Sequence, residues 1–294
     1  MTEPIFGGDE VGQAPADTAT VAVIPAPLES TVSYGGGTEH GPAGLLRASC
    51  ELEFFDEELG APYPFLGRVH TTPPVAFTRD ADGTIDGEAA VHAIRDRVTE
   101  ATAHGAWPLL IGGEHTVTLG AVQSLAARDA DFGVVFVDAH LDLRDRYTGT
   151  PWSHACVARR LIEAGHRVDW CGIRSVSQEE AEFVAALGLA PRYAHQIVDD
   201  RERSWIAPFV ASLPPRVYLT LDVDGLDPAV IPGTGTPEPG GLDYRTVLAL
   251  IRELTRERTL VGADIVELAP IPGQQGSEFT AAKLAAKLLA ALPH

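Results

Sequence analysis

The stretch FGVVFVDAHLDLR (residues 132–144) joins two opposite kinds of sequence. Its first half is a nearly continuous apolar run, which is typical of a parallel strand covered on both faces of a sheet. Its second half places Asp138, His140 and Asp142 at every second position. Charged side chains are costly to bury unpaired. The sequence therefore predicts a strand that ends at a site where something compensates these charges.

Apolar runs of this kind alternate with amphipathic stretches along most of the chain. The alternation predicts an α/β fold with a doubly wound, mostly parallel central sheet and helices on both faces. The expected strands are residues 20–27, 107–113, 132–140, 168–175, 216–224 and 259–268. The expected helices are residues 87–104, 116–129, 154–165, 177–187, 243–256 and 279–292, with Asp243 as an N-cap. In such a sheet, ligands bind beyond the carboxyl ends of the strands.

Residues 21–294 are predicted to form a single domain, because neither an internal repeat nor a linker interrupts them. Residues 1–20 are acidic and lack the basic and apolar character of a signal sequence. We expect them to form an N-terminal arm that is mobile or ordered by a neighbouring subunit. The Pro/Gly-rich residues 228–242 are expected to be a loop, and their length favours a functional role.

The composition argues against several classes of partner. A net charge of −19 disfavours nucleic acid and anionic membranes, which require basic patches. The apolar runs are too short to cross a bilayer. An acidic protein attracts a cationic substrate, although an acidic surface also serves solubility alone. Three cysteines without paired spacing, Cys50, Cys156 and Cys171, are typical of a reducing compartment, so a cytoplasmic location is expected.

Potential metal ligands collect where the predicted strands end. They are four carboxylates and two imidazoles, from His115, Asp138, His140, Asp142, Asp222 and Asp224. Clustered carboxylates repel one another unless cations neutralise them, and two divalent ions would cancel a charge of −4. Mixed carboxylate and imidazole ligands suit manganese or another first-row metal. A single-zinc hydrolase and a metal-binding protein without catalytic activity remain alternatives.

Several segments resemble the signature blocks of the ureohydrolase family, which includes arginases and agmatinases. They are GGEHT (112–116), DAHLD (138–142), SHACVARR (153–160), LDVDGLDPAVIPGTGTPEPGGL (221–242) and DIVELAP (264–270). The segment VSYGGGTEHGPAGLLRAS (32–49) is also similar to a block of this family. The resemblance implies a three-layer arginase-like fold with a sheet of about eight strands, and a homo-oligomer, either a trimer or a hexamer.

The resemblance also implies a binuclear manganese centre with two Mn²⁺ ions per subunit. In that scheme His115 binds one ion and His140 the other, and Asp138 and Asp222 bridge both. Asp142 then completes the first site and Asp224 the second.

The family's chemistry implies roles for further residues. A hydroxide held by the metals attacks a guanidinium carbon, and Asp142 accepts or orients its proton. Glu267 matches the glutamate that pairs with the guanidinium, and His154 matches the histidine that passes a proton to the leaving amine. Glu114 is either a residue that orients the ligands or an ordinary loop carboxylate.

The form SHACV resembles the agmatinase branch, so the expected substrate is agmatine, a small cationic guanidino compound that gives putrescine and urea. Arginine is disfavoured because the asparagine-bearing stretches of arginases are absent, and the sequence contains no Asn. Guanidinobutyrate, guanidinopropionate, aminopropylagmatine and arginine remain open as alternatives. Candidate residues of the substrate pocket are Trp152, Thr236 and Glu238, and the orientations of Arg144 and Arg146 are not fixed by the sequence.

Overall fold

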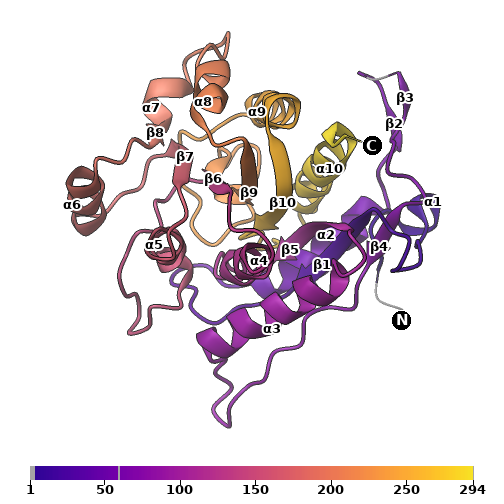
Figure 1. Ribbon diagram of the computed structural model, residues 1–294, viewed down its shortest axis with the longest axis horizontal. Helices are drawn as coiled ribbons and strands as arrows, with labels where there is room; N and C mark the ends of the chain where they lie inside the picture. The colour runs from indigo at the N-terminus through magenta and orange to yellow at the C-terminus, as the bar shows by residue number, and fades with distance from the viewer. Residues whose placement is uncertain (1–3, 59, 294) are drawn as a thin grey trace.

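The computed structural model describes residues 4–58 and 60–293 and is built around an eight-stranded sheet (Figure 1). The strand order is β4-β1-β5-β10-β9-β6-β7-β8, and every pairing in it is parallel. The strands are β1 (Val21–Ala26), β4 (Val69–Thr71), β5 (Trp107–Gly112), β6 (Gly133–Val137), β7 (Val168–Ile173), β8 (Arg192–Tyr193), β9 (Arg216–Asp222) and β10 (Thr259–Val266). The expected parallel α/β sheet is confirmed.

The six predicted strands form the interior of this sheet. The sequence does not reveal the two edge strands β4 and β8, because three and two residues are too few for a periodic signal. A second sheet, the short antiparallel pair β2 (Phe55–Asp56) and β3 (Ala61–Pro62), was also not predicted.

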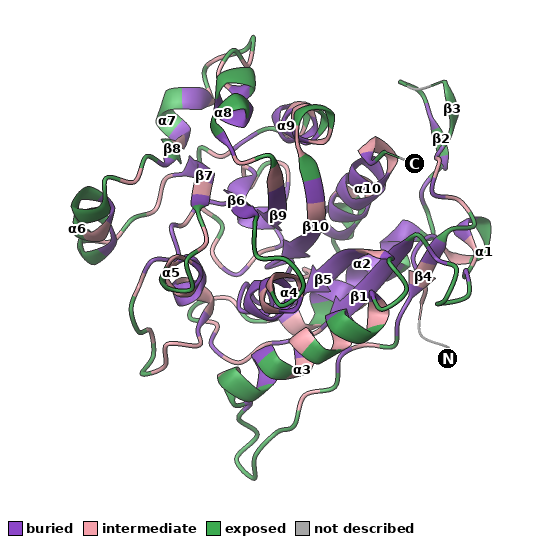
Figure 2. Cartoon of the chain, in the orientation of Figure 1, coloured by how far each residue is buried: buried purple, intermediate pink, exposed green. Residues whose placement is uncertain are grey.

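Helices cover both faces of the large sheet, which gives the three layers. Alternate residues of β1 enter different apolar clusters: Val21 and Val23 join one, and Ala22 and Ile24 join the other. The first cluster includes residues of α2 (Gly41–Ser49), α7 (Ala194–Ile197), α8 (Ile206–Ser212), α9 (Tyr244–Glu257) and α10 (Gly276–Ala291). The second includes residues of α3 (Gly87–Ala101), α4 (Val117–Ala126), α5 (Val157–Glu163) and α6 (Gln178–Leu187). Strands β1 and β6 are wholly buried between these layers, whereas the edge strand β8 is not (Figure 2).

The six predicted helices correspond to α3, α4, α5, α6, α9 and α10. Asp243 caps α9 as expected, because its side chain accepts a hydrogen bond from Thr246 N at 2.8 Å. The helices α2, α7, α8 and α1 (Gly8–Val11) were not predicted; α2 carries two glycines and a proline, which mask its helical pattern. Within the described residues, no helix is both long and apolar enough to span a membrane.

The N-terminal segment packs against its own chain. Phe6 is fully buried, its ring centroid lies 6.1 Å from that of Phe65, and its backbone N–H donates to Thr71 Oγ1 at 3.0 Å. We expected an arm that is mobile or ordered by a neighbouring subunit. In this single chain Phe6 packs on its own domain, and a contact of the arm with another subunit stays a prediction. Residues 1–3 of the segment, residue 59 and residue 294 lie outside the described part of the chain.

Candidate metal centre

Four neighbouring strands, β5, β10, β9 and β6, deliver the candidate site residues to one edge of the sheet. His115 follows β5, Glu267 follows β10, Asp222 ends β9 and Asp138 follows β6. Parallel strands end at the same edge, so residues that are far apart in the sequence meet there. The fold thus explains why the ligand candidates collect at one place.

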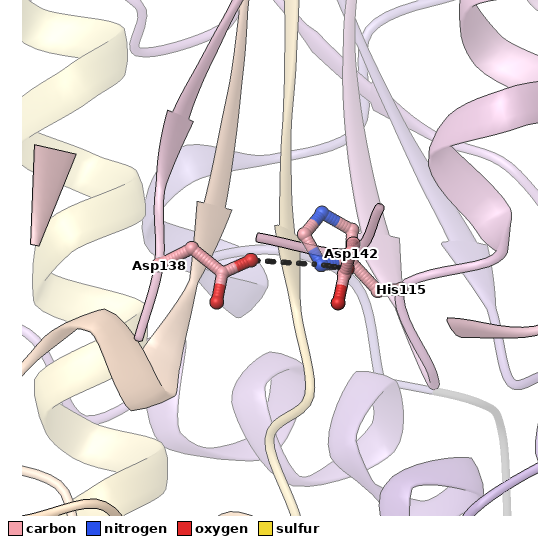
Figure 3. A group of neighbouring side chains, drawn as sticks. All are labelled: His115, Asp138 and Asp142. Atoms are coloured by element: carbon pink, nitrogen blue, oxygen red, sulfur yellow. Dashed lines mark ion pairs between the residues drawn. The ribbon is translucent and has the colours of Figure 1, made fainter. Parts of the chain in front are cut away.

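Three carboxylates converge on one ring nitrogen in the first group of candidate ligands. His115 Nδ1 lies 3.3 Å from Asp138 Oδ2, 3.0 Å from Asp142 Oδ2 and 3.3 Å from Asp222 Oδ2. Figure 3 shows Asp138 and Asp142 facing the imidazole of His115. A ring nitrogen carries at most one proton, so it cannot donate to three carboxylates at once. A divalent cation between these atoms would satisfy all of them.

A second group lies beside the first and shares one residue with it. His140 Nδ1 lies 3.0 Å from Asp224 Oδ2 and 3.6 Å from Asp138 Oδ1. Asp138 therefore presents one oxygen to each group, which is the position of a bridging ligand. Asp222 also faces His115, but its other oxygen accepts a hydrogen bond from Asp224 N at 2.8 Å. These contacts place Asp222 with the first group and leave its bridging role a prediction.

The chain reaches these positions through a loop. We expected alternation along an extended strand to aim Asp138, His140 and Asp142 at one face. Strand β6 instead ends at Val137, and Asp142 has a φ of 52° in the left-handed region. Asp138 and Asp142 face His115, whereas His140 joins the second group. The predicted convergence is present, but the predicted cause, strand alternation, is wrong.

The donor atoms fit metal ions. His115 Nδ1 and Asp138 Oδ2 are buried and form no hydrogen bond of acceptable geometry. Burial and the nearby Asp138 charge raise the pKa of Asp142 to about 7, and burial with the Asp224 charge raises that of Asp222. Buried polar atoms without a partner and buried carboxylates with a raised pKa destabilise the fold. Carboxylate oxygens and imidazole nitrogens are ligands of first-row divalent metals. Metal ions would remove this cost.

Removing metal should therefore make stability depend on pH. A carboxyl group whose pKa rises on folding stabilises the fold at low pH and loses that contribution as pH passes the folded pKa. For Asp142 this loss falls between pH 4 and about 7. Bound metal competes with these protons, so the Tm difference between Mn²⁺-loaded and EDTA-treated protein should widen by at least ~5 °C from pH 5 to pH 8. Thermal unfolding at five pH values would check this, and a constant difference would contradict it.

Glu267 is a buried residue in contact with the backbone of the metal-ligand candidate His115. Its Oε1 accepts a hydrogen bond from His115 N at 2.6 Å, and its backbone has a φ of 63°. Burial, followed by the charge of Glu114, raises the pKa of Glu267 well above its usual value. A bound cation would offset both effects, so this carboxylate is suited to receive one.

A cavity of about 260 Å³ opens over the two groups. Its lining includes most residues that the sequence singled out, namely His115, His140, Asp142, His154, Asp222, Asp224, Thr236, Glu238 and Glu267. Arg144 and the exposed Tyr34 also line it, whereas Arg146 is not among its lining residues.

Within this cavity, Thr236 Oγ1 donates to Asp224 Oδ2 at 3.3 Å, and Glu238 Oε1 lies 3.9 Å from His140 Nε2. Trp152 is not part of the lining. It packs against the second apolar cluster, close to Gly87 at the start of α3. The structure therefore does not bring this large apolar side chain to the expected pocket.

The sequence did not predict the role of Arg174 in organising the site, and it left two alternative roles for Glu114. Arg174 donates to backbone oxygens on both sides of the pocket loop, including Asp224 O at 2.6 Å and Pro239 O at 3.2 Å. No local pattern marks Arg174, because its partners are 50 and 65 residues away.

Glu114 is fully buried and accepts hydrogen bonds from Ser30, Thr31 and Thr116, so it is no ordinary loop carboxylate.

The fold and the site together define a class: a parallel α/β protein with carboxylate and imidazole groups that could bind metal ions at the carboxyl edge of its sheet. Residues 19–291 match the sequence model of the Arginase family, so the chain belongs to the arginase, or ureohydrolase, family. This confirms the resemblance seen in the motifs. The chain is accordingly an amidinohydrolase, a hydrolase acting on C–N bonds of linear amidines.

Individual relatives are similar over nearly their whole length. An N(1)-aminopropylagmatine ureohydrolase of Synechocystis sp. is 40% identical over 274 residues, covering 92% of this chain and 88% of that protein. An agmatinase of Pyrococcus horikoshii is 34% identical, covering 90% and 89%. The crystal structure of agmatine ureohydrolase of Thermoplasma volcanium superimposes with a TM-score of 0.85 at 30% identity, covering 99% of this chain and 94% of that one.

Proposed function

We propose that this protein is a binuclear manganese amidinohydrolase that releases urea from the guanidinium group of agmatine or of its aminopropyl derivative. The observation that carries the proposal is the shared carboxylate of Asp138, whose two oxygens face two separate imidazole groups. A site for one metal needs no such residue. In this proposal His115, Asp142 and Asp222 would hold one ion, His140 and Asp224 would hold the other, and Asp138 and Asp222 would be shared between them.

When bound, the metal pair supplies a nucleophile by lowering the pKa of water toward 7. The protein's own groups do the rest. Glu267, held by the backbone of His115, pairs with the guanidinium and orients its carbon. Asp142, whose Oδ2 lies 3.0 Å from His115 Nδ1, accepts or orients the proton of the attacking water. His154 delivers a proton to the leaving amine, from the wall of the same cavity.

The substrate is proposed to be a guanidine that carries further positive charge. The similar proteins are named for aminopropylagmatine and for agmatine, and the chain's net charge of −19 favours cations. Glu238 lines the cavity, and its carboxylate would pair with the distal ammonium of the substrate. Thr236 lines the same cavity and donates a hydrogen bond to Asp224. Agmatine would give putrescine and urea, and the aminopropyl derivative would give spermidine and urea.

One observation favours a second candidate, a guanidino acid. Arg144 lines the cavity, and its guanidinium lies 5.1 Å from the centre of the Tyr147 ring. Among the described residues, no carboxylate forms an ion pair with Arg144. An unpaired arginine would attract a substrate carboxylate such as that of guanidinobutyrate.

A panel of guanidino compounds distinguishes these substrates. With the Mn²⁺-loaded enzyme, kcat/KM for agmatine or aminopropylagmatine should exceed that for arginine and guanidinobutyrate by roughly 100-fold or more. The reason is that arginine and guanidinobutyrate carry a carboxylate, and a substrate charge that the site does not match is strongly disfavoured. Urea release is the measurement. A preference for guanidinobutyrate that Arg144→Met abolishes would establish the second candidate instead, and no turnover of any compound would refute the proposed hydrolase.

We further propose that the enzyme is cytoplasmic and forms a homo-oligomer, either a trimer or a hexamer. The three cysteines are unpaired, which suits a reducing compartment, and two of them are buried.

A further inference from the structure

Glu114 and Thr31 connect the metal-ligand segment to His154. Glu114 is fully buried beside His115, and its carboxylate accepts five hydrogen bonds. Oε2 accepts from Ser30 N and Thr31 N, each at 2.7 Å. Oε1 accepts from three hydroxyl groups, at distances between 2.8 and 3.0 Å, on Ser30, Thr31 and Thr116. Glu114 is the acceptor in all five of these hydrogen bonds.

This arrangement fixes the direction of the Thr31 hydroxyl. A hydroxyl group has one proton, and Thr31 uses it to donate to Glu114 Oε1 at 3.0 Å. Thr31 Oγ1 can then only accept from its other neighbours. These are His154 N at 3.2 Å and His154 Nδ1 at 3.0 Å. The second contact is a hydrogen bond only if Nδ1 carries a proton.

We propose that Glu114 and Thr31 fix the tautomer of His154, so that Nδ1 holds a proton and Nε2 is the nitrogen that exchanges protons with the substrate. Glu114 and Thr31 are positioning residues, since they act through His154. The inference rests on the proposed catalytic role of His154 and deepens it.

The surroundings of His154 agree with this assignment. Burial lowers the pKa of His154, so the ring is neutral near pH 7 and its tautomer matters. Tyr147 packs edge-on against the ring with centroids 5.6 Å apart, which restricts ring rotation. The competing neighbour, Ser153 Oγ, lies farther from Nδ1, at 3.5 Å. With Nδ1 bonded to Thr31, Nε2 is the basic ring atom left for the cavity. It can gain a proton and release it from the same position.

The tautomer can be read directly in the intact protein. We would load full-length, ¹⁵N-histidine-labelled enzyme with diamagnetic Zn²⁺ and identify the His154 signals by their loss in His154→Gln. The expected spectrum has a protonated Nδ1 and an unprotonated Nε2. The opposite tautomer in the wild-type protein would overturn the inference, without reference to any variant's folding or activity.

Two matched variants test the consequence for catalysis. Thr31→Val keeps the shape but removes the acceptor, so kcat should fall roughly 10- to 100-fold with KM and metal content little changed, and the Nε2–H form should appear. Thr31→Ser restores the hydroxyl and should recover most of kcat. Wild-type kcat in folded Thr31→Val would overturn the inference. If His154→Gln itself retained full kcat, the proposed role of His154 would fail instead, whatever the tautomer.

Discussion

Replacing Asp138 with asparagine should abolish activity by removing both metal ions. Asp138 is fully buried, and each of its two oxygens faces a different imidazole group. An amide nitrogen cannot bind a cation, and it would place a donor among groups that are arranged to receive positive charge. We expect metal content to fall from about two ions per subunit to well below one, and kcat to fall by ~10⁴ or more. Metal analysis and urea release are the measurements.

Asp145→Asn is the matched control for this prediction. Asp145 is in the same loop, three residues after Asp142, but it is exposed and pairs with Arg160 at the surface. Surface ion pairs contribute ~0–1 kcal/mol, so this variant should keep its metal ions and its activity. Retention of two metal ions by Asp138→Asn would remove the basis for a shared ligand. Equal losses in both variants would point to misfolding of the loop.

The position of the metal-ligand candidates could be predicted because it depends on sheet topology. His115, Asp138 and Asp222 each stand at the end of an apolar strand, and a parallel sheet brings such ends together. The local path could not be predicted in the same way. Asp142 turns into the left-handed region, which places it with His115, and no periodicity marks that turn. Strand alternation was the wrong reason for a correct grouping.

Residues that support the site were harder to recognise because their partners are distant in sequence. Thr31 and His154 are 123 residues apart, and Arg174 reaches a loop 64 residues away. A single Thr or Arg between apolar segments forms no sequence pattern from which such long-range contacts can be predicted. The burial of Phe6 is a similar case, since its contacts with Phe65 and Thr71 arise only when the chain has folded. The acidic composition of this segment predicted an arm, and composition gives no sign that one of its rings is buried against Phe65.

Glu267→Gln should separate recognition of the guanidinium from metal binding. The glutamine side chain can still accept the hydrogen bond from His115 N, so the ligand segment should stay in place. The negative charge that pairs with the guanidinium is lost. Removing one partner of a buried charge pair costs ~2–5 kcal/mol, and each 1.4 kcal/mol is a factor of ten. We therefore expect kcat/KM to fall by about 10²- to 10³-fold while two metal ions remain bound.

The comparison with Glu267→Ala shows which function of the side chain matters. Alanine removes the acceptor for His115 N as well as the charge, so metal content should fall only in this variant. Inhibition by the product amine gives a second control, because the amine lacks the guanidinium and should bind Glu267→Gln as well as it binds the wild type. If Glu267→Gln kept wild-type kcat/KM, Glu267 would not pair with the substrate. If it lost its metal ions, the carboxylate would serve the ligand segment rather than the guanidinium, and substrate recognition would have to come from another group in the cavity.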